Sequence, residues 1–254
     1  MMATNPLSLQ MYTLRDLAAT DYLGTLRKVK EIGYGAVEIA GFSGMSAAAL
    51  RRELDAIGLV VSGAHVPIQM LESQLDAIIA DMQTLGAPYL ICPWMPPERR
   101  SSANDYRSLA QVLNSIGATA SDAGLSFCYH HHDFELQPFG DTTGMHILLN
   151  ECDPRCVAFE IDVYWAAYAG IDPVQLINEF AGRVPLVHLK DMTPGHRTFA
   201  EVGYGTLDIP AILQAARAAG AQWFVVEQDI CQRPPLESVR MSYEYLKSLG
   251  AASA

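Results

Sequence analysis

The sequence predicts an α/β fold, a (β/α)8 TIM barrel that forms a single domain over residues 1–254. Three observations predict it. Short apolar runs recur eight times, segments with helical periodicity separate them, and glycines follow the helical segments at regular places. A length of about 250 residues is typical of such a barrel. No linker, low-complexity tract or shift in composition marks a second domain.

The eight apolar runs are rich in residues that favour β-structure and are the predicted strands. In chain order they are Leu7–Met11, Gly35–Ile39, Leu59–His65, Tyr89–Trp94, Ser126–His132, Val157–Asp162, Pro185–Lys190 and Trp223–Glu227. The segments with helical periodicity between them include Tyr22–Ile32, Ala47–Ile57, Ile68–Leu85, Tyr106–Ala123 and Pro210–Ala219. Regular strand–helix units favour a closed parallel sheet. An open doubly wound sheet usually begins with a glycine-rich phosphate loop, and Tyr12–Asp16 contains no glycine.

Glycine and proline mark the ends of the predicted helices. A helix is often followed by a glycine, because the residue after it usually adopts a left-handed backbone conformation. Six glycines have this place: Gly33, Gly58, Gly86, Gly124, Gly182 and Gly220. Asp172 and Asp208 stand just before an early proline, and we expect each of them to cap the start of a helix.

The chain carries 28 acidic and 17 basic side chains, which gives a net charge of −11. This balance argues against a nucleic-acid partner or an anionic membrane, because both require a basic surface. No apolar run is long enough to cross a bilayer, and Met1–Leu9 lacks the basic flank and apolar run of a secretion signal. The five cysteines lie apart and mostly within apolar stretches, so we expect a reduced, cytoplasmic protein.

Polar side chains gather where the predicted strands end, which is where barrels of this kind place their sites. The first four strand ends offer Gln10, Tyr12, Glu38, His65 and Trp94. The last four are richer and offer His130–Glu135, Glu160, Asp162, His188, Lys190 and Glu227–Asp229. Alternation along a strand predicts that Glu160 and Asp162 point into the barrel, as do His188, Lys190 and Glu227. It also turns His131 away from His130 and His132.

Several carboxylates that converge in a barrel would repel one another, and a bound cation removes that conflict. Acidic oxygens together with imidazoles suit one divalent metal ion, namely Mn²⁺, Mg²⁺ or Co²⁺, with Zn²⁺ as a further fit. Taken singly, an inward Glu160 or His65 is more often a hydrogen-bonded structural residue than a ligand, and three consecutive histidines can arise by chance. Four successive strands that all end in metal-competent residues favour the metal site.

Five phrases resemble the sugar phosphate isomerase/epimerase family, part of the xylose isomerase-like barrel superfamily that includes inosose dehydratase and ketose 3-epimerases. The phrases are Leu9–Asp16, Tyr129–Glu135, Ile161–Trp165, His188–Asp191 and Val226–Asp229. They span nearly the whole chain and keep the family order. The ordered set is specific for the superfamily and says little about the substrate.

The resemblance implies one divalent metal held by Glu, Asp, His and Glu from consecutive late strands. Asp162, His188 and Glu227 match three of these ligands. In ketose 3-epimerases the first ligand is a Glu on the fifth strand, about where this chain has Tyr129 or His130. Two readings stay open. Either Glu135 reaches back to the ion, which we expect, or an imidazole from His130 or His132 replaces it.

The resemblance also implies the chemistry: a sugar isomerase or epimerase that transfers a proton next to a carbonyl through a metal-stabilised enediolate, on a keto-sugar or related polyol. Glu227 is then the base that removes the proton, and His130 or His132 is the acid–base group on the opposite face of the substrate. Lys190 holds a substrate oxygen or, alternatively, forms an ion pair with Asp191. The expected substrate contacts are Gln10, Tyr12, His65, Trp94 and Trp165, although the two tryptophans could equally be core residues.

Other functions remain open. A histidine can protonate a leaving hydroxyl, which keeps a dehydratase or lyase of the inosose dehydratase type as an alternative. A sugar-binding barrel without turnover would show the same pattern. An endonuclease IV-type nuclease needs a basic DNA face, which the acidic composition disfavours. The low basic content favours an unphosphorylated small-molecule sugar, and association into homo-oligomers, as in relatives, is compatible with the sequence.

Overall fold

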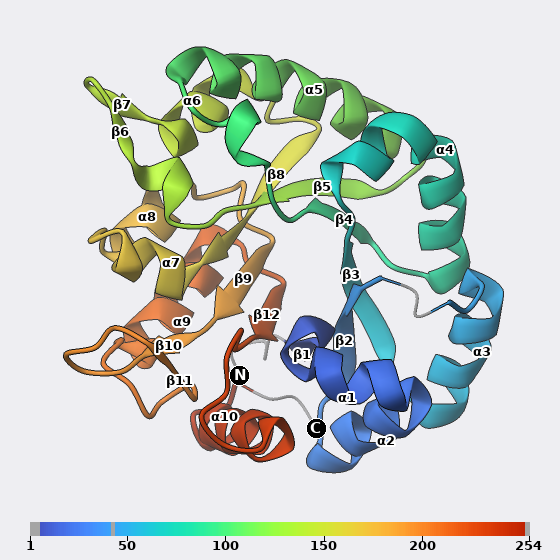
Figure 1. The fold of residues 1–254 in the computed structure, drawn as a ribbon. Helices are drawn as coiled ribbons and strands as arrows, with labels where there is room; N and C mark the ends of the chain where they lie inside the picture. Colours follow the sequence, from blue (N-terminus) through green and yellow to red (C-terminus); the bar gives the residue numbers. More distant parts are fainter. Residues whose placement is uncertain (1–5, 42–43, 252–254) are drawn as a thin grey trace.

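The protein forms a closed barrel of eight parallel strands in a computed structural model that describes residues 6–41 and 44–251 (Figure 1). The strands are β1 (Leu7–Gln10), β2 (Ala36–Ala40), β3 (Val60–His65), β4 (Tyr89–Cys92), β5 (Ser126–His130), β8 (Val157–Asp162), β9 (Leu186–Leu189) and β12 (Trp223–Val226). They follow one another around the barrel in chain order, and β1 pairs with β12 to close it, with Leu7 opposite Phe224. The predicted fold class is confirmed.

Helices surround the barrel on its outer side (Figure 1). They are α1 (Arg15–Thr20), α2 (Tyr22–Ile32), α3 (Ala47–Ile57), α4 (Ile68–Leu85), α5 (Ala103–Asp122), α6 (Gly144–Glu151), α7 (Val163–Tyr168), α8 (Pro173–Glu179), α9 (Ile209–Ala219) and α10 (Pro235–Ser248). The predicted bounds of α2, α3 and α4 are confirmed. Helix α5 begins earlier than predicted, because the Ser102 side chain accepts a hydrogen bond from the Asp105 amide and caps the helix there.

The predicted helix caps are also confirmed. Asp172 accepts a hydrogen bond from the Val174 amide, and Asp208 accepts one from the Ala211 amide. Gly58 ends α3 with a φ of 79°, a left-handed conformation that L-residues rarely adopt. These local signals fix where each helix starts and stops, and therefore where the chain turns back toward the barrel.

Several strands end earlier than predicted. The 3-10 helix η1 (Met11–Leu14) begins directly after β1, and the Gln10 side chain caps it by accepting a hydrogen bond from the Tyr12 amide at 3.1 Å. Likewise β5 ends at His130, and the 3-10 helix η3 (Phe134–Leu136) begins four residues later. Short strands leave the polar residues on the last strand positions and the first loop positions.

The barrel interior has two layers of side chains. The lower layer, nearer the amino ends of the strands, is apolar, and the upper layer, at their carboxyl ends, is polar. The apolar layer consists of Tyr89, Ile91, Cys128, Leu186 and Val225. Two positions further along β5, β9 and β12, the inward residues are His130, His188 and Glu227. Phe159 and Ile161 point outward into the main core, as predicted. The apolar layer closes the lower end of the barrel and confines the polar groups to its upper mouth.

All five cysteines are free. Within residues 6–41 and 44–251, no helix is long and apolar enough to span a membrane. Residues 1–5 of the segment assessed for a secretion signal lie outside the described residues. Two short hairpins follow β5 and β9 in the chain. They pair β6 (Pro138–Phe139) with β7 (Thr142–Thr143), and β10 (Asp191–Met192) with β11 (Phe199–Ala200).

Candidate active site

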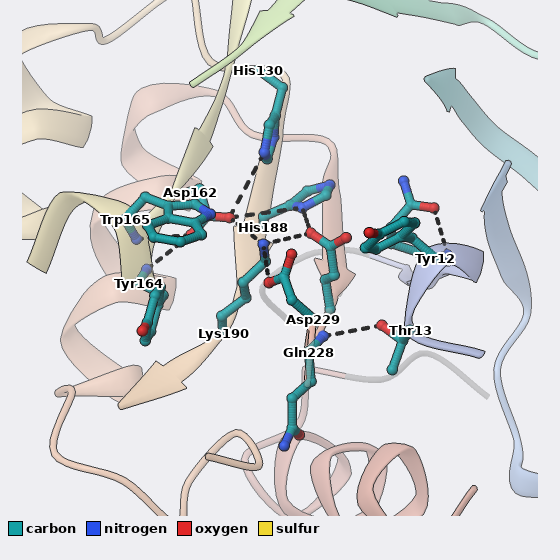
Figure 2. A network of polar contacts seen from close by, with 12 residues as sticks. Tyr12, Thr13, His130, Asp162, Tyr164, Trp165, His188, Lys190, Gln228 and Asp229 are labelled. Carbon is teal, nitrogen blue, oxygen red and sulfur yellow. Dashed lines mark hydrogen bonds and ion pairs between the residues drawn. The ribbon is translucent and has the colours of Figure 1, made fainter. Parts of the chain in front are cut away.

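Four consecutive strands bring four buried side chains together at the upper mouth. His130, Asp162, His188 and Glu227 each offer a ligand atom, and these atoms lie within 4.8 Å of one another. His188 Nδ1 is 2.9 Å from Glu227 Oε2. Asp162 Oδ2 lies 3.9 Å from His130 Nε2 and 4.0 Å from His188 Nδ1 (Figure 2). We call these four residues the cluster.

Carboxylates outside the cluster orient its two imidazoles. His130 Nδ1 is 3.0 Å from Glu160 Oε2, and His188 Nε2 is 2.8 Å from Glu38 Oε1. Both contacts are made by the ring nitrogen that faces away from Asp162. A histidine that binds a metal usually donates its other N–H to such a carboxylate, which fixes the ring and its tautomer.

A second set of four groups, His65, His130, Glu160 and His188, also has the spacing of a metal site. In this set the His65 Nε2 atom that would bind the ion already contacts both Glu38 and Glu160, at 3.0 and 2.9 Å. His188 would also have to bind through the nitrogen that faces those carboxylates. The second set is therefore better described as the hydrogen-bonded support of the cluster.

Lys190 adds a positive charge beside the cluster. Its Nζ atom lies 2.7 Å from Glu227 Oε2, 2.9 Å from Asp229 Oδ2 and 3.0 Å from Asp162 Oδ2 (Figure 2). The side chain is only 1% exposed. Burial alone would lower the pKa of Lys190, but the three carboxylates hold it well above its usual value. The ammonium therefore partly neutralises two of the cluster's carboxylates.

The protonation states follow from burial and from these neighbours. Burial would raise the pKa of Glu227, but Lys190 and His188 outweigh it and hold that pKa well below its usual value, so Glu227 is ionised at neutral pH. The pKa of Asp162 is raised to about 6, mainly by burial. The pKa of His132 is lowered well below its usual value, first by burial and then by Lys190, so its ring is neutral.

The structure corrects the expectation that Glu135 reaches back to the ion. The Glu135 carboxylate accepts a hydrogen bond from the Tyr129 hydroxyl at 2.5 Å and one from the His132 amide at 2.8 Å. Tyr129 and His130 point to opposite sides of β5, and η3 folds Glu135 back onto Tyr129. His130, the alternative that the sequence left open, is the fifth-strand residue of the cluster.

A cavity of about 580 Å³ opens above the cluster. Of the predicted catalytic residues, His130, His132, Lys190 and Glu227 line it. Of the predicted substrate contacts, Tyr12, His65 and Trp94 line it. These seven side chains come from the ends of early and late strands, as expected for a barrel site.

Gln10 and Trp165 are not among the described residues that line this cavity, and their role as substrate contacts stays a prediction. Gln10 is fully buried and donates a hydrogen bond to Glu38 Oε1 at 2.7 Å. Trp165 lies behind the cavity wall, with its ring 5.4 Å from that of His132 and 5.6 Å from Lys190 Nζ. Gln10 thus supports Glu38, which contacts His188, and Trp165 packs beside two residues that line the cavity.

A comparison with protein families matches residues 26–249 to the family described as "Xylose isomerase-like TIM barrel". The chain belongs to the xylose isomerase-like TIM barrel family. An inosose dehydratase from Geobacillus kaustophilus (strain HTA426) is 24% identical over 266 residues, which covers 88% of this chain and 86% of that protein.

Two solved structures share the fold of this xylose isomerase-like barrel. A sugar phosphate isomerase/epimerase from Parabacteroides distasonis ATCC 8503 superposes with a TM-score of 0.87 at 23% identity, covering 99% of this chain and 96% of that one. The IolI protein, described with a binding zinc atom, has a TM-score of 0.75 at 13% identity, covering 98% and 99% of the two chains.

The cluster of this xylose isomerase-like barrel fits a divalent cation. Its donors are two carboxylates and two imidazoles, a mixed oxygen and nitrogen set suited to first-row divalent metals. Among the described residues, Asp162 Oδ2 is buried and accepts no hydrogen bond of good geometry, although the Lys190 ammonium lies 3.0 Å from it. A cation between the four ligand atoms would give this oxygen a direct bond.

Sequence reasoning did not select Glu38, Glu160 or Asp229 as site residues. Glu38 and Glu160 are fully buried between the imidazoles, and Asp229 lines the cavity and contacts Lys190. The alternation rule that assigned Asp162 to the interior also places Glu38 there, since its neighbours Val37 and Ile39 are in the outer core. The predicted alternative of a Lys190–Asp191 ion pair does not occur, because Asp191 binds loop amides instead.

Proposed function

We propose that this protein is a divalent-metal-dependent enzyme that transfers a proton next to a carbonyl group of a keto-sugar or related polyol. One observation carries the proposal. The Glu227 carboxylate lines the cavity and is ionised, while its Oε2 atom lies 2.9 Å from His188 and 2.7 Å from Lys190. A carboxylate base thus belongs to the cluster and also lines the cavity that would hold a substrate.

We expect His130, Asp162, His188 and Glu227 to hold the metal. The fitting ions are Mn²⁺, Mg²⁺, Co²⁺ and Zn²⁺, and the zinc atom of IolI supports the inclusion of zinc. A divalent ion bound there would act as a Lewis acid on the adjacent carbonyl and hydroxyl oxygens of the substrate. The outer carboxylates Glu38 and Glu160 would keep the two imidazoles in place.

The residues around the cavity have complementary roles in this proposal. Glu227 accepts the proton from the carbon beside the carbonyl. The Lys190 ammonium, which contacts Asp162, Glu227 and Asp229, places a positive charge near the oxygen that gains negative charge, in a buried site where such a charge acts strongly. The neutral His132 ring also lines the cavity and is the candidate for proton exchange on another face of the substrate.

Elimination of water or of another substituent is a second candidate reaction, and one observation favours it. The fifth-strand position holds the imidazole of His130, so the cluster lacks the second glutamate that ketose 3-epimerases use for two-sided proton exchange. Glu227 can remove the proton and, with the Lys190 ammonium 2.7 Å away, return it to a leaving group on the same face. The similarity to an inosose dehydratase agrees with this reaction.

Deuterium exchange tests the proposal. The protein is incubated in D₂O with Mn²⁺ and a panel of keto-hexoses and inososes, and NMR follows the carbon beside the carbonyl. We expect label uptake, and we expect Glu227→Gln to abolish it while the exposed control Glu244→Gln retains it. An epimerase yields an epimer, whereas a lyase yields an unsaturated product that absorbs in the ultraviolet.

Two outcomes would contradict the proposal. A fully active Glu227→Gln variant would remove Glu227 from the role of base. Sugar binding by the metal-loaded protein without any exchange would identify a binding barrel without turnover.

A further inference from the structure

The cavity above the cluster has two unlike walls. All of its charged or imidazole lining groups, among the described residues, belong to the acid–base side already discussed. The opposite wall is formed by η1, the segment from the end of β3 into α4, and the segment after β4. Its main lining residues are Tyr12, Val66, Pro67, Met70, Pro93 and Trp94.

This apolar wall is unusually open to solvent. Tyr12 is 44% exposed, Trp94 is 42% exposed and Met70 is 39% exposed. These are three of the eight large apolar side chains that are exposed among the described residues. Single exposed apolar residues are common, but a group of them around one concave site marks a surface that binds an apolar partner.

Arginine side chains lie beside both aromatic rings. The Arg15 guanidinium lies 4.3 Å from the centre of the Tyr12 ring, and the Arg100 guanidinium, which packs on Phe134 at 3.4 Å, lies 5.7 Å from that of Trp94. Such cation–π contacts restrict the rings' orientation. A ring that is already ordered loses less conformational freedom when a ligand packs against it.

The wall offers little to a second hydroxylated ring. Apart from the Tyr12 hydroxyl and the Trp94 indole N–H, its described side chains carry no hydrogen-bonding group. Sugar hydroxyls turned toward it would find only these two partners, whereas an apolar ring needs none. The volume of about 580 Å³ lies in the range of pockets that enclose drug-sized ligands, so there is room for more than one six-membered ring.

We propose that the substrate is a carbonyl-bearing sugar or cyclitol ring joined to an apolar, aryl-type group. The polar ring lies over the cluster, and the aryl group packs between Tyr12, Met70 and Trp94. The inference rests on the proposed function for the polar ring, and the apolar wall carries the assignment of the attached group.

Non-reactive glycosides test this assignment separately from catalysis. Calorimetry on the full chain with Mn²⁺ compares phenyl and methyl glycosides of the gluco, galacto and manno configurations, which have no carbonyl. We expect the phenyl member of at least one pair to bind about tenfold or more tightly than its methyl partner. Trp94→Ala should remove this difference and Met70→Gln should reduce it. The control Tyr204→Ala changes an aromatic residue that is 56% exposed outside the cavity and should preserve it.

Three results would overturn the assignment. Equal affinity within every pair, including no measurable binding of any phenyl glycoside, would show that the wall does not recognise an aryl group. Tighter binding of the matching disaccharides would assign the wall to a second sugar ring. A preference for phenyl that survives both Trp94→Ala and Met70→Gln would place the aryl group elsewhere. None of these results affects the deuterium-exchange test of the proposed function.

Discussion

His130 is the residue of β5 that we expect to bind the metal ion. Its Nε2 atom faces Asp162 while Glu160 holds Nδ1, whereas the oxygens of Glu135 are engaged by Tyr129 and the His132 amide. We expect His130→Ala to weaken Mn²⁺ and Zn²⁺ binding by about 100-fold, because one of four ligands and its oriented ring are lost. Glu135→Gln should change the affinity by less than about threefold. Calorimetric titration of both variants checks this, and the reverse ranking would restore Glu135 as the ligand.

Glu135 instead controls how stability depends on pH. Burial raises its pKa to about 7 from an ordinary value of 4.5, in spite of the Tyr129 and His132 hydrogen bonds. The folded state therefore binds this proton more tightly than the unfolded state does. The contribution of Glu135 to the free energy of unfolding falls as the pH rises from 4.5 through 7. Above pH 7 the full loss of stability that its ionisation causes is present.

Glu135→Gln should remove the loss of stability that ionisation of Glu135 causes. The amide can accept the hydrogen bond from His132 and donate one to the Tyr129 hydroxyl. We expect the variant to be more stable than the wild type by about 1–3 kcal/mol at pH 8, and the difference to shrink toward zero near pH 4.5. Urea unfolding with EDTA present at both pH values measures it. A gain that is the same at both pH values would show that ionisation of Glu135 is not the cause.

At the scale of elements, Asp191 connects the end of β9 to the loop that leads into α9. It is fully buried, and one carboxylate oxygen accepts hydrogen bonds from the Gly203 and Gly205 amides at 3.0 Å. The other oxygen accepts one from the Leu207 amide at 3.1 Å. A side chain at residue 205 would collide with Asp191, since a Cβ there would lie 2.2 Å from it. The glycine allows the loop to approach this closely.

Asp191→Asn should lower the unfolding free energy by about 3 kcal/mol, because its NH₂ group would face N–H donors. Asp208→Asn is the matched control. Asn caps a helix about as well as Asp does, so this change at the start of α9 should cost less than about 0.5 kcal/mol. Denaturant unfolding compares the two variants. Equal losses of unfolding free energy in the two variants would mean that the Asp191 hydrogen bonds do not stabilise the loop more than a helix cap does.

The elements differ in how far the sequence predicts them. Strand alternation correctly placed Asp162, His188 and Lys190 inside the barrel, because one face of each strand is strictly apolar. Strand ends were less predictable. Whether β5 stops at His130 or continues depends on a 3-10 turn and on the Tyr129–Glu135 hydrogen bond, which is a tertiary contact with no periodic signal. The misassignment of Glu135 arose from this.

On the scale of the whole molecule, the barrel interior holds more negative than positive charge at its mouth. Lys190 is the buried ammonium beside Asp162 and Glu227. Lys190→Met would leave these carboxylates unpaired, and we expect a loss of about 3–5 kcal/mol in unfolding free energy when EDTA is present. Saturating Mn²⁺ should recover more stability in this variant than in the wild type, because the ion no longer competes with an ammonium.

Thermal and urea unfolding with and without Mn²⁺ measure this difference. The control Lys247→Met removes an exposed lysine from α10 and should respond to Mn²⁺ as the wild type does. If Lys190→Met gains less from Mn²⁺ than the wild type, the ammonium assists the metal rather than competing with it.

The two walls of the cavity come from different stretches of the chain. The aromatic side belongs to connecting segments in the first half, whereas the groups that hold the ion and move the proton lie at the ends of strands, or within two residues after them, in the second half. Connecting segments tolerate insertion and exchange far better than barrel strands do. Grafting these early loops from one relative to another should thus yield chimaeras that accept new compounds with unchanged chemistry, so selectivity in this scaffold can be engineered without rebuilding the reaction centre.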